Sequence, residues 1–124
     1  MKALSVKPPW SGLIACGVKT IETRTWRTEY RGDLLICSSK SIDRNVPPSL
    51  FVSDECFKRG VAICIVNVVT CVPMTDGHVK EACCQVYDGA WAWILEDIRI
   101  VKNVPVKGGL SIFNVPFEPK DLLL

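Results

Sequence analysis

The sequence is poor in the residues that build metal centres and disulfide frameworks. It has a single histidine, His78, and its seven cysteines are an odd set without any Cys-x-x-Cys pair. A structural zinc site needs four correctly placed ligands, and disulfide frameworks use even sets of cysteines in an oxidising compartment. We therefore expect seven free thiols, no bound metal and no cofactor.

Long apolar runs are also missing. The longest, Val61 to Val66, is far too short to cross a bilayer and ends at Asn67. Pro8 and Pro9 interrupt the first part of the chain, which does not have the pattern of a signal peptide. These absences predict a cytoplasmic protein without a membrane partner. The length and the ordinary globular composition predict one domain, residues 1–124.

Net charge is small, but the charges are unevenly spread. The formal net charge is +2, yet residues 1–45 hold eight Lys and Arg against four acidic residues. The same segment contains Trp10, Trp26 and Tyr30. Basic and aromatic side chains in one segment favour an anionic partner that contains bases. This excess of positive charge is too small to indicate strong non-specific binding to duplex nucleic acid.

The most chemically loaded segment is Gly17-Val18-Lys19-Thr20-Ile21-Glu22-Thr23-Arg24. Gly17 is suited to cap a short helix, and the residues after it favour a strand. Side chains two apart on a strand share a face, so Glu22 and Arg24 should point the same way and Thr23 away from them. Lys19, at the turn, could join that face. The trio is either a polar ligand site or a partly exposed salt bridge with little effect on stability.

The remaining patterns are mostly those of strands. Strands are predicted over residues 3–7, 21–26, 34–38, 61–72, 90–101 and 110–115, and helices over residues 10–16 and 48–59. Residues 73–89 read as a polar loop or a short helix. The run 61–72 is apolar on both faces, as a central strand would be. The order predicts an α+β, mostly β fold: a small, nearly closed barrel of about six strands with helices at its openings.

Several motifs in this order extend over nearly the whole chain: Leu4-Ser5-Val6-Lys7-Pro8-Pro9-Trp10, Gly17-x-Lys19-x-x-Glu22-x-Arg24, Tyr30-Arg31-Gly32, Ser39-Lys40 and Pro105-Val106-Lys107-Gly108-Gly109-Leu110. Together they resemble the ASCH domain of the PUA-like superfamily. The resemblance implies a PUA-like mixed β-barrel with two short helices flanking a cleft that binds RNA or a nucleotide-like ligand. Two positions differ from the usual family pattern, because Pro8 replaces a glutamine and Cys37 replaces a histidine.

The resemblance and the residue chemistry together predict a set of ligand-binding residues. They are Trp10, Lys19, Glu22, Arg24, Trp26, Tyr30, Ser39 and Lys40. Trp10 is a candidate platform on which a base could stack, and Ser39-Lys40 follows a strand end, where it could meet a phosphate or carbonyl oxygen. Trp26 and Tyr30 are at least as compatible with cross-strand packing. Trp91 and Trp93 are assigned to the core.

The leading functional prediction is a module that binds RNA or a modified nucleoside. One branch of the family resembles an amidohydrolase of acetylated cytidine, with a catalytic lysine at the Lys19 position and a threonine nucleophile where this chain has Glu22. In a hydrolase of this kind, Glu22 would be a general base toward water and Lys19 would stabilise the developing anion. Whether the chain is an enzyme stays open. A ribonuclease and a protein-interaction module in transcription or translation are weaker alternatives.

Overall fold

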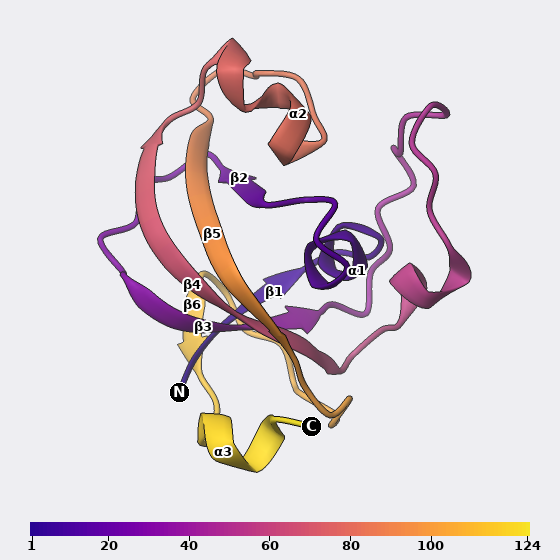
Figure 1. Ribbon diagram of the computed structural model, residues 1–124, viewed down its shortest axis with the longest axis vertical. Helices are drawn as coiled ribbons and strands as arrows, with labels where there is room; N and C mark the ends of the chain where they lie inside the picture. Colours follow the sequence, from indigo (N-terminus) through magenta and orange to yellow (C-terminus); the bar gives the residue numbers. More distant parts are fainter.

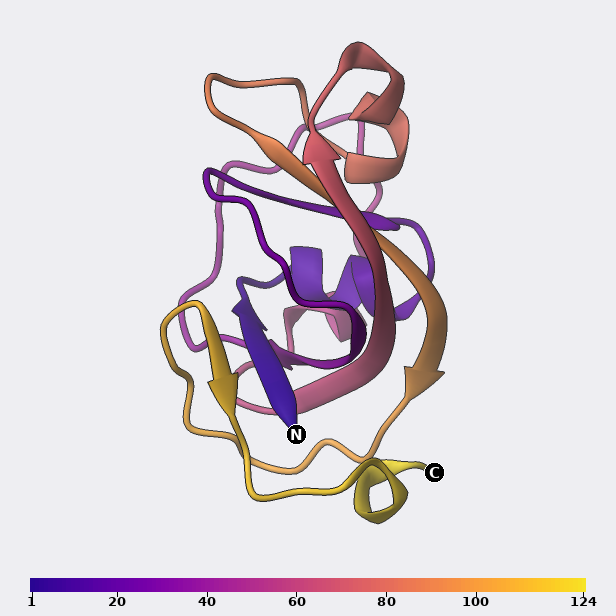
Figure 2. The same cartoon turned by 90° about the vertical axis from the view of Figure 1, so that its left-hand side faces the viewer.

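The computed structural model describes residues 1–124, and its central feature is one strongly curled six-stranded sheet. The strands are β1 (Lys2–Val6), β2 (Ile21–Arg24), β3 (Gly32–Ser38), β4 (Ala62–Pro73), β5 (Trp91–Ile100) and β6 (Ile112–Asn114). Their order is β2-β5-β4-β3-β1-β6, in which β1 and β3 are parallel and all other neighbours are antiparallel. The curl produces the mostly β, PUA-like barrel that the sequence predicted (Figures 1 and 2).

Short helices and turns cover the concave side and the ends of this sheet. They are α1 (Trp10–Ala15), η1 (Asp54–Phe57), η2 (Asp76–His78), α2 (Val79–Ala82) and α3 (Pro119–Leu122). Helix α1 packs against β3, β4 and β5, while α2 and α3 lie at opposite ends of the molecule (Figure 1). None of these helices has the length and apolar character needed to cross a membrane.

Strand β4 is the central strand of the sheet, as its apolar run predicted. Its first five residues are all buried. Val66 belongs to the core cluster that also contains Trp93, whereas Ile65 packs with Leu122 of α3 in a second cluster. Apolar neighbours on both faces explain why this stretch reads as a continuous hydrophobic run. The last strand, β6, pairs with β1 at the edge of the same sheet, which confirms its predicted place.

The helix predicted over residues 48–59 is wrong. Only the single turn η1 forms there, and the segment before it is irregular. Phe51 is 87% exposed, and Leu50, Val52 and Phe57 are only half-buried. Cys56 is the buried residue of η1. A short helix in water depends on burial of one face, and this segment buries too little to support one.

Gly12 allows α1 to lie directly against η1. A Cβ at this position would lie 2.4 Å from the Cα of Cys56, so the backbone of η1 would have to move. Alanine is favoured over glycine in a helix by about 1 kcal/mol, but overpacking costs about 1–3 kcal/mol. We therefore expect Gly12→Ala to lower the free energy of unfolding, as measured by chemical denaturation.

Gly77→Ala is the matched control for this substitution. A Cβ on Gly77 would be 3.6 Å from its nearest neighbour, which is an ordinary contact, and the residue does not need a positive φ. Its stability should therefore equal or exceed that of the parent chain. If the two variants are equally stable, the close approach of α1 to η1 does not constrain the fold.

Candidate functional site

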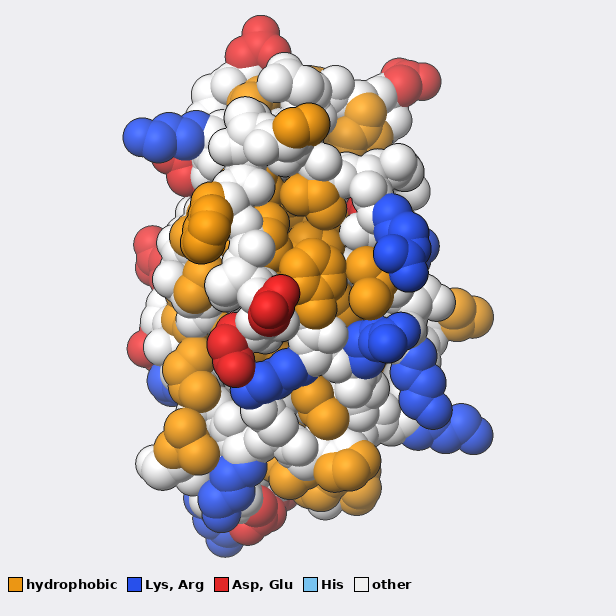
Figure 3. All heavy atoms as spheres, turned by 90° about the vertical axis from the view of Figure 1, so that its right-hand side faces the viewer, with side chains coloured by type: hydrophobic (Ala, Val, Ile, Leu, Met, Phe, Trp, Pro, Cys, Tyr) orange, Lys and Arg blue, Asp and Glu red, His pale blue; other side chains and the backbone are white.

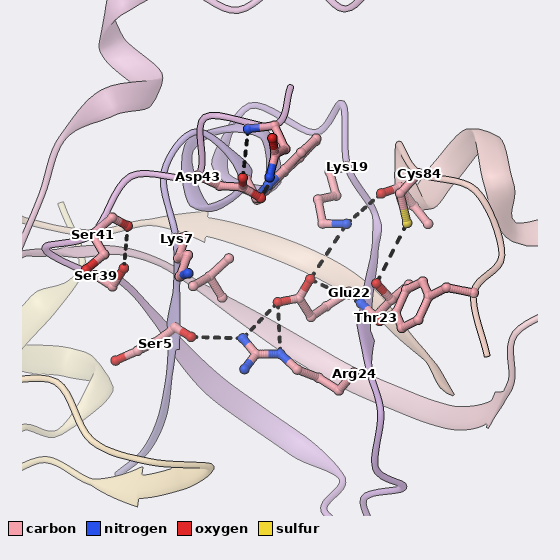
Figure 4. Close-up of a pocket in the computed structure, with 15 residues that line it drawn as sticks. Ser5, Lys7, Lys19, Glu22, Thr23, Arg24, Ser39, Ser41, Asp43 and Cys84 are labelled. Carbon is pink, nitrogen blue, oxygen red and sulfur yellow. Dashed lines mark hydrogen bonds and ion pairs between the residues drawn. The ribbon is translucent and has the colours of Figure 1, made fainter. Parts of the chain in front are cut away.

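A cavity of about 580 Å³ lies between α1, β2, the end of β1 and the loop that follows β3. Residues of the turn after α2 complete its wall. This volume falls within the range of small-molecule sites, about 300–1,000 Å³. Five of the residues predicted from the sequence line the cavity: Trp10, Lys19, Glu22, Arg24 and Ser39. Figure 4 shows how these separate segments direct polar groups toward one another.

Glu22 holds the charged trio together. One carboxylate oxygen, Oε2, accepts hydrogen bonds from Nε and Nη2 of Arg24 at 3.3 and 3.0 Å. The other, Oε1, accepts the backbone N–H of Thr23 at 3.1 Å and lies 3.6 Å from Nζ of Lys19. The side chains of Lys19 and Glu22 are only 4% and 8% exposed. Lys19 and Glu22 therefore form a buried ion pair, and the side chain of Arg24, which is 26% exposed, extends this pair toward the cavity.

The turn between α1 and β2 places Lys19 in this network. Gly17 has a φ of +82°, a left-handed conformation that glycine adopts without strain. The chain then reverses, and the N–H groups of Val18 and Lys19 both donate to the carbonyl of Leu13. The ammonium of Lys19 donates to the carbonyl of Ala82 at 2.6 Å. The charge is thus fixed between two elements rather than free in solvent.

Trp10 and the loop after β3 form the opposite wall. The indole Nε1 of Trp10 donates to Oδ2 of Asp43 at 2.8 Å, and the N–H of Asn45 donates to Oδ1 at 2.9 Å. The hydrogen bond from Trp10 is the main reason that the pKa of Asp43 lies below its ordinary value, and the hydrogen bond from Asn45 lowers it further. Nζ of Lys19 lies 5.6 Å from the centroid of the Trp10 ring, within cation–π range. Asp43 therefore fastens this loop over α1.

Three predicted residues do not line this cavity. Trp26 packs edge-to-face against the buried Trp93, with 4.8 Å between ring centroids, so core packing accounts for it. The hydroxyl of Tyr30 donates to the carbonyl of Asp33. Lys40 lines a neighbouring cavity instead.

Several lining residues were not predicted from the sequence. Thr23 was expected to face away from Glu22, yet both line the cavity. Strand β2 is short, forms one edge of the sheet and contacts α2, so both of its faces adjoin the hollow. Oγ1 of Thr23 lies 3.8 Å from Sγ of Cys84. Asp43 and Cys84 come from irregular segments, and strand periodicity carries no signal for their positions.

The sulfur and acidic groups offer little metal or acid–base chemistry. No group of three or more His, Cys, Asp or Glu side chains is arranged to hold a metal ion, and all seven cysteines are unpaired thiols. Cys37, where the resemblance stated from the sequence implies a histidine, is buried, and burial raises its pKa to about 12. A neutral, buried thiol cannot take over the proton transfers of an imidazole near neutral pH.

The curled sheet and the polar cavity beside α1 and β2 define a small, mostly β fold with a candidate ligand site. The family model of the ASCH domain matches residues 4–105, and the chain belongs to this family. No curated protein is significantly similar to it in sequence.

Solved structures share the fold at low sequence identity. The chain is similar to the crystal structure of ASCH from Zymomonas mobilis, with 15% identity and a TM-score of 0.63 over 92% of this chain and 86% of that one. Two single-residue mutants of that protein match with 13% identity and TM-scores of 0.59 and 0.57, each over 92% of this chain and over 88% and 87% of theirs. At such identities the likeness establishes a common fold.

Replacing Glu22 by glutamine removes the charge that compensates Lys19 and Arg24. Breaking a buried ion pair from one side costs about 3–5 kcal/mol. We expect Glu22→Gln to lose stability on this scale in chemical denaturation, contrary to the small effect that the sequence suggested. Glu29→Gln is the control, because Glu29 pairs with Arg27 at the surface and is 77% exposed. Similar stability of the two variants would show that burial of the trio is unimportant.

The lowered pKa of Asp43 predicts a pH-dependent contribution to stability. Because the folded pKa lies below the ordinary value of 3.8, the contribution is complete above that value and is lost as the pH falls through the folded pKa. Asp43→Asn should therefore be less stable than the parent at neutral pH. The difference should shrink in increasingly acidic denaturation series. A difference that stays constant into strong acid would contradict this role.

Proposed function

We propose that this ASCH domain binds RNA or a modified nucleoside in the cavity between α1 and β2. The observation that carries the proposal is the presence of an indole wall and fixed charged donors in one cavity of nucleoside-compatible size. An aromatic face such as that of Trp10 stacks on any base. Fixed donors can then distinguish bases by the oxygen and nitrogen atoms on their edges.

The network leaves donors rather than acceptors for a ligand. The carboxylate of Glu22 already accepts three hydrogen bonds, so its main effect is to orient the two cations. Arg24 uses Nε and Nη2 for Glu22 and the carbonyl of Ser5, which leaves Nη1 without a partner in the chain. A guanidinium carries five N–H donors. The site is therefore suited to a base edge that presents carbonyl oxygens.

A hydrolase of an acetylated cytidine is the second candidate. It is favoured by the hydroxyl of Thr23, which lines the same cavity as the ammonium of Lys19. Such an ammonium could stabilise the oxyanion formed at an amide carbonyl. Glu22 is less suitable as a general base, because its oxygens are already occupied by Arg24 and a backbone N–H. Binding without turnover is therefore the better-supported function, and no feature of the cavity favours a ribonuclease or a protein-interaction module.

Lys19→Met tests both candidates. Loss of a charge-assisted hydrogen bond, about 1.5–3 kcal/mol, should weaken binding of cytidine and acetylated cytidine by about tenfold or more in calorimetric titrations. Circular dichroism reports whether the variant is folded. Lys80→Met is the control, since Lys80 is exposed on α2 and does not line the cavity. It should bind like the parent.

The same titrations separate the candidates. Release of acetate from acetylated cytidine by the parent, lost in Lys19→Met, would favour the hydrolase. Binding without release would favour the recognition module. If the parent binds neither nucleoside nor a short single-stranded RNA, the proposal is wrong.

A further inference from the structure

We infer that the ligand carries a phosphate group, and that this group binds in a second cavity adjoining the first; the inference rests on the proposed function. The second cavity has a volume of about 590 Å³ and lies between the end of β3, Gly60 in the turn before β4 and the loop that leads to β6. Ser5 and Ser39 line both cavities. A base at Trp10 and its phosphate can therefore belong to one molecule that spans this shared wall.

The charges of the second cavity favour an anion. Lys40 and Lys107 line it, and no carboxylate does. Neither lysine takes part in any ion pair of the chain. The aliphatic stem of Lys40 lies along Gly60, because a Cβ there would be 3.6 Å from both Cγ and Cε of the lysine. Two uncompensated ammonium groups in one hollow concentrate anions and bind phosphate as point charges.

Ser5 provides an independent observation. Its Oγ is buried and has no hydrogen-bond partner in the chain, although buried hydroxyls almost always have one. The carbonyl of Ser5 accepts a bond from Arg24 at 2.8 Å, whereas the hydroxyl points away from Arg24 (Figure 4). The hydroxyl lies against Gly108, where a Cβ would approach it to 3.1 Å. The hydroxyl is shielded from solvent in the free protein, so its side chain must rotate before a phosphate oxygen in the second cavity, which Ser5 lines, can supply the missing partner.

The wall that carries Lys107 is held in place before any ligand binds. The N–H of Val106 donates to the carbonyl of Gly60 at 3.0 Å, and the N–H of Gly60 donates to the carbonyl of Ser38 at 2.8 Å. Gly60 has a φ of +70°, which glycine adopts without strain. A preformed wall lowers the entropic cost of binding. The motif Lys107-Gly108-Gly109 thus acquires a role that the cavity at Trp10 does not explain.

Charge also distinguishes the two cavities taken together from the rest of the surface. Five cations line them, namely Lys7, Lys19, Arg24, Lys40 and Lys107, against the two carboxylates of Glu22 and Asp43. The whole chain has a net charge of only +2. Figure 3 shows one face on which Lys and Arg side chains gather beside a hollow lined by hydrophobic groups. A phosphate-bearing ligand fits this local excess better than a neutral nucleoside does.

The first test uses inorganic phosphate alone, so that it does not depend on the base. In ¹⁵N-resolved NMR titrations at constant ionic strength, phosphate should cause saturable shifts at the amides of Gly60, Lys107 and Gly108. The double variant Lys40→Gln/Lys107→Gln should weaken this binding by about tenfold or more, as expected for lost charge-assisted bonds. Lys120→Gln, at an exposed position of α3, is the control and should leave it unchanged. Absence of saturable shifts, or equal binding by the double variant, would overturn the inference.

A second variant distinguishes a loss of phosphate binding from a loss of folding. Ser5→Ala removes a hydroxyl that has no partner in the free protein, so its stability should be unchanged or slightly higher, while phosphate binding should weaken. A loss of stability in this variant would overturn the role assigned to the hydroxyl.

The third test uses ligands that would occupy both cavities at once. Its outcomes separate a failure of this inference from a failure of the proposed function. Cytidine 5′-monophosphate and a cytidine dinucleotide represent a terminal phosphate and a chain phosphodiester, and each should bind about tenfold or more tightly than cytidine. In the double variant this preference should disappear while cytidine binds as before. Equal affinity of the parent for all three compounds would overturn the inference but leave the proposed function intact. Phosphate binding without any nucleoside binding would refute the proposed function alone.

Discussion

The need to compensate one buried carboxylate organises the region around the cavity. A buried charge is costly unless it is paired and hydrogen-bonded. Glu22 meets this requirement with Arg24 from its own strand and Lys19 from the turn after α1. Both cations then reach further, to the carbonyl of Ala82 near α2 and to that of Ser5 in β1. The compensation of the Glu22 carboxylate thus fixes β2, the turn after α1, the end of α2 and β1 relative to one another.

Under the proposed function, this arrangement couples stability to ligand recognition. The donors that face the cavity are rigid because the same side chains neutralise a buried charge, and rigid donors discriminate better than mobile ones. The cost is chemical, since a carboxylate held by several donors is poorly available for proton transfer. Cys37 is buried, and its raised pKa keeps it from acting as an acid–base group near neutral pH. The chemistry left to the site is that of cations and hydroxyls, which favours binding over catalysis.

The sequence predicted the parts of the fold that depend on regular burial. The apolar run of β4 forms a buried strand, and the spacing of Lys19, Glu22 and Arg24 brings their side chains to one cavity. Local rules, those of strand pairing and of a glycine-capped turn, are enough to predict both. The segment before η1 shows the limit of such rules, because a helix was predicted there, yet Phe51 is almost fully exposed and only the single turn η1 forms. Asp43 is placed by a tertiary contact with Trp10, which no local pattern encodes. Long-range contacts between irregular segments account for most of what was missed.

Under the proposed function, the walls around Trp10 restrict the ligand further. A base that reaches Trp10 must leave any helical stack, because the indole lies within a cavity bounded by α1, β2 and the loop of Asp43. A paired base in a duplex has no access to such a wall, and extruding one costs a few kcal/mol. The modest net charge of +2 supplies little non-specific attraction to offset that cost. Within the proposed function, a free nucleotide or an unpaired base in a single strand is therefore a better candidate ligand than a double-stranded partner.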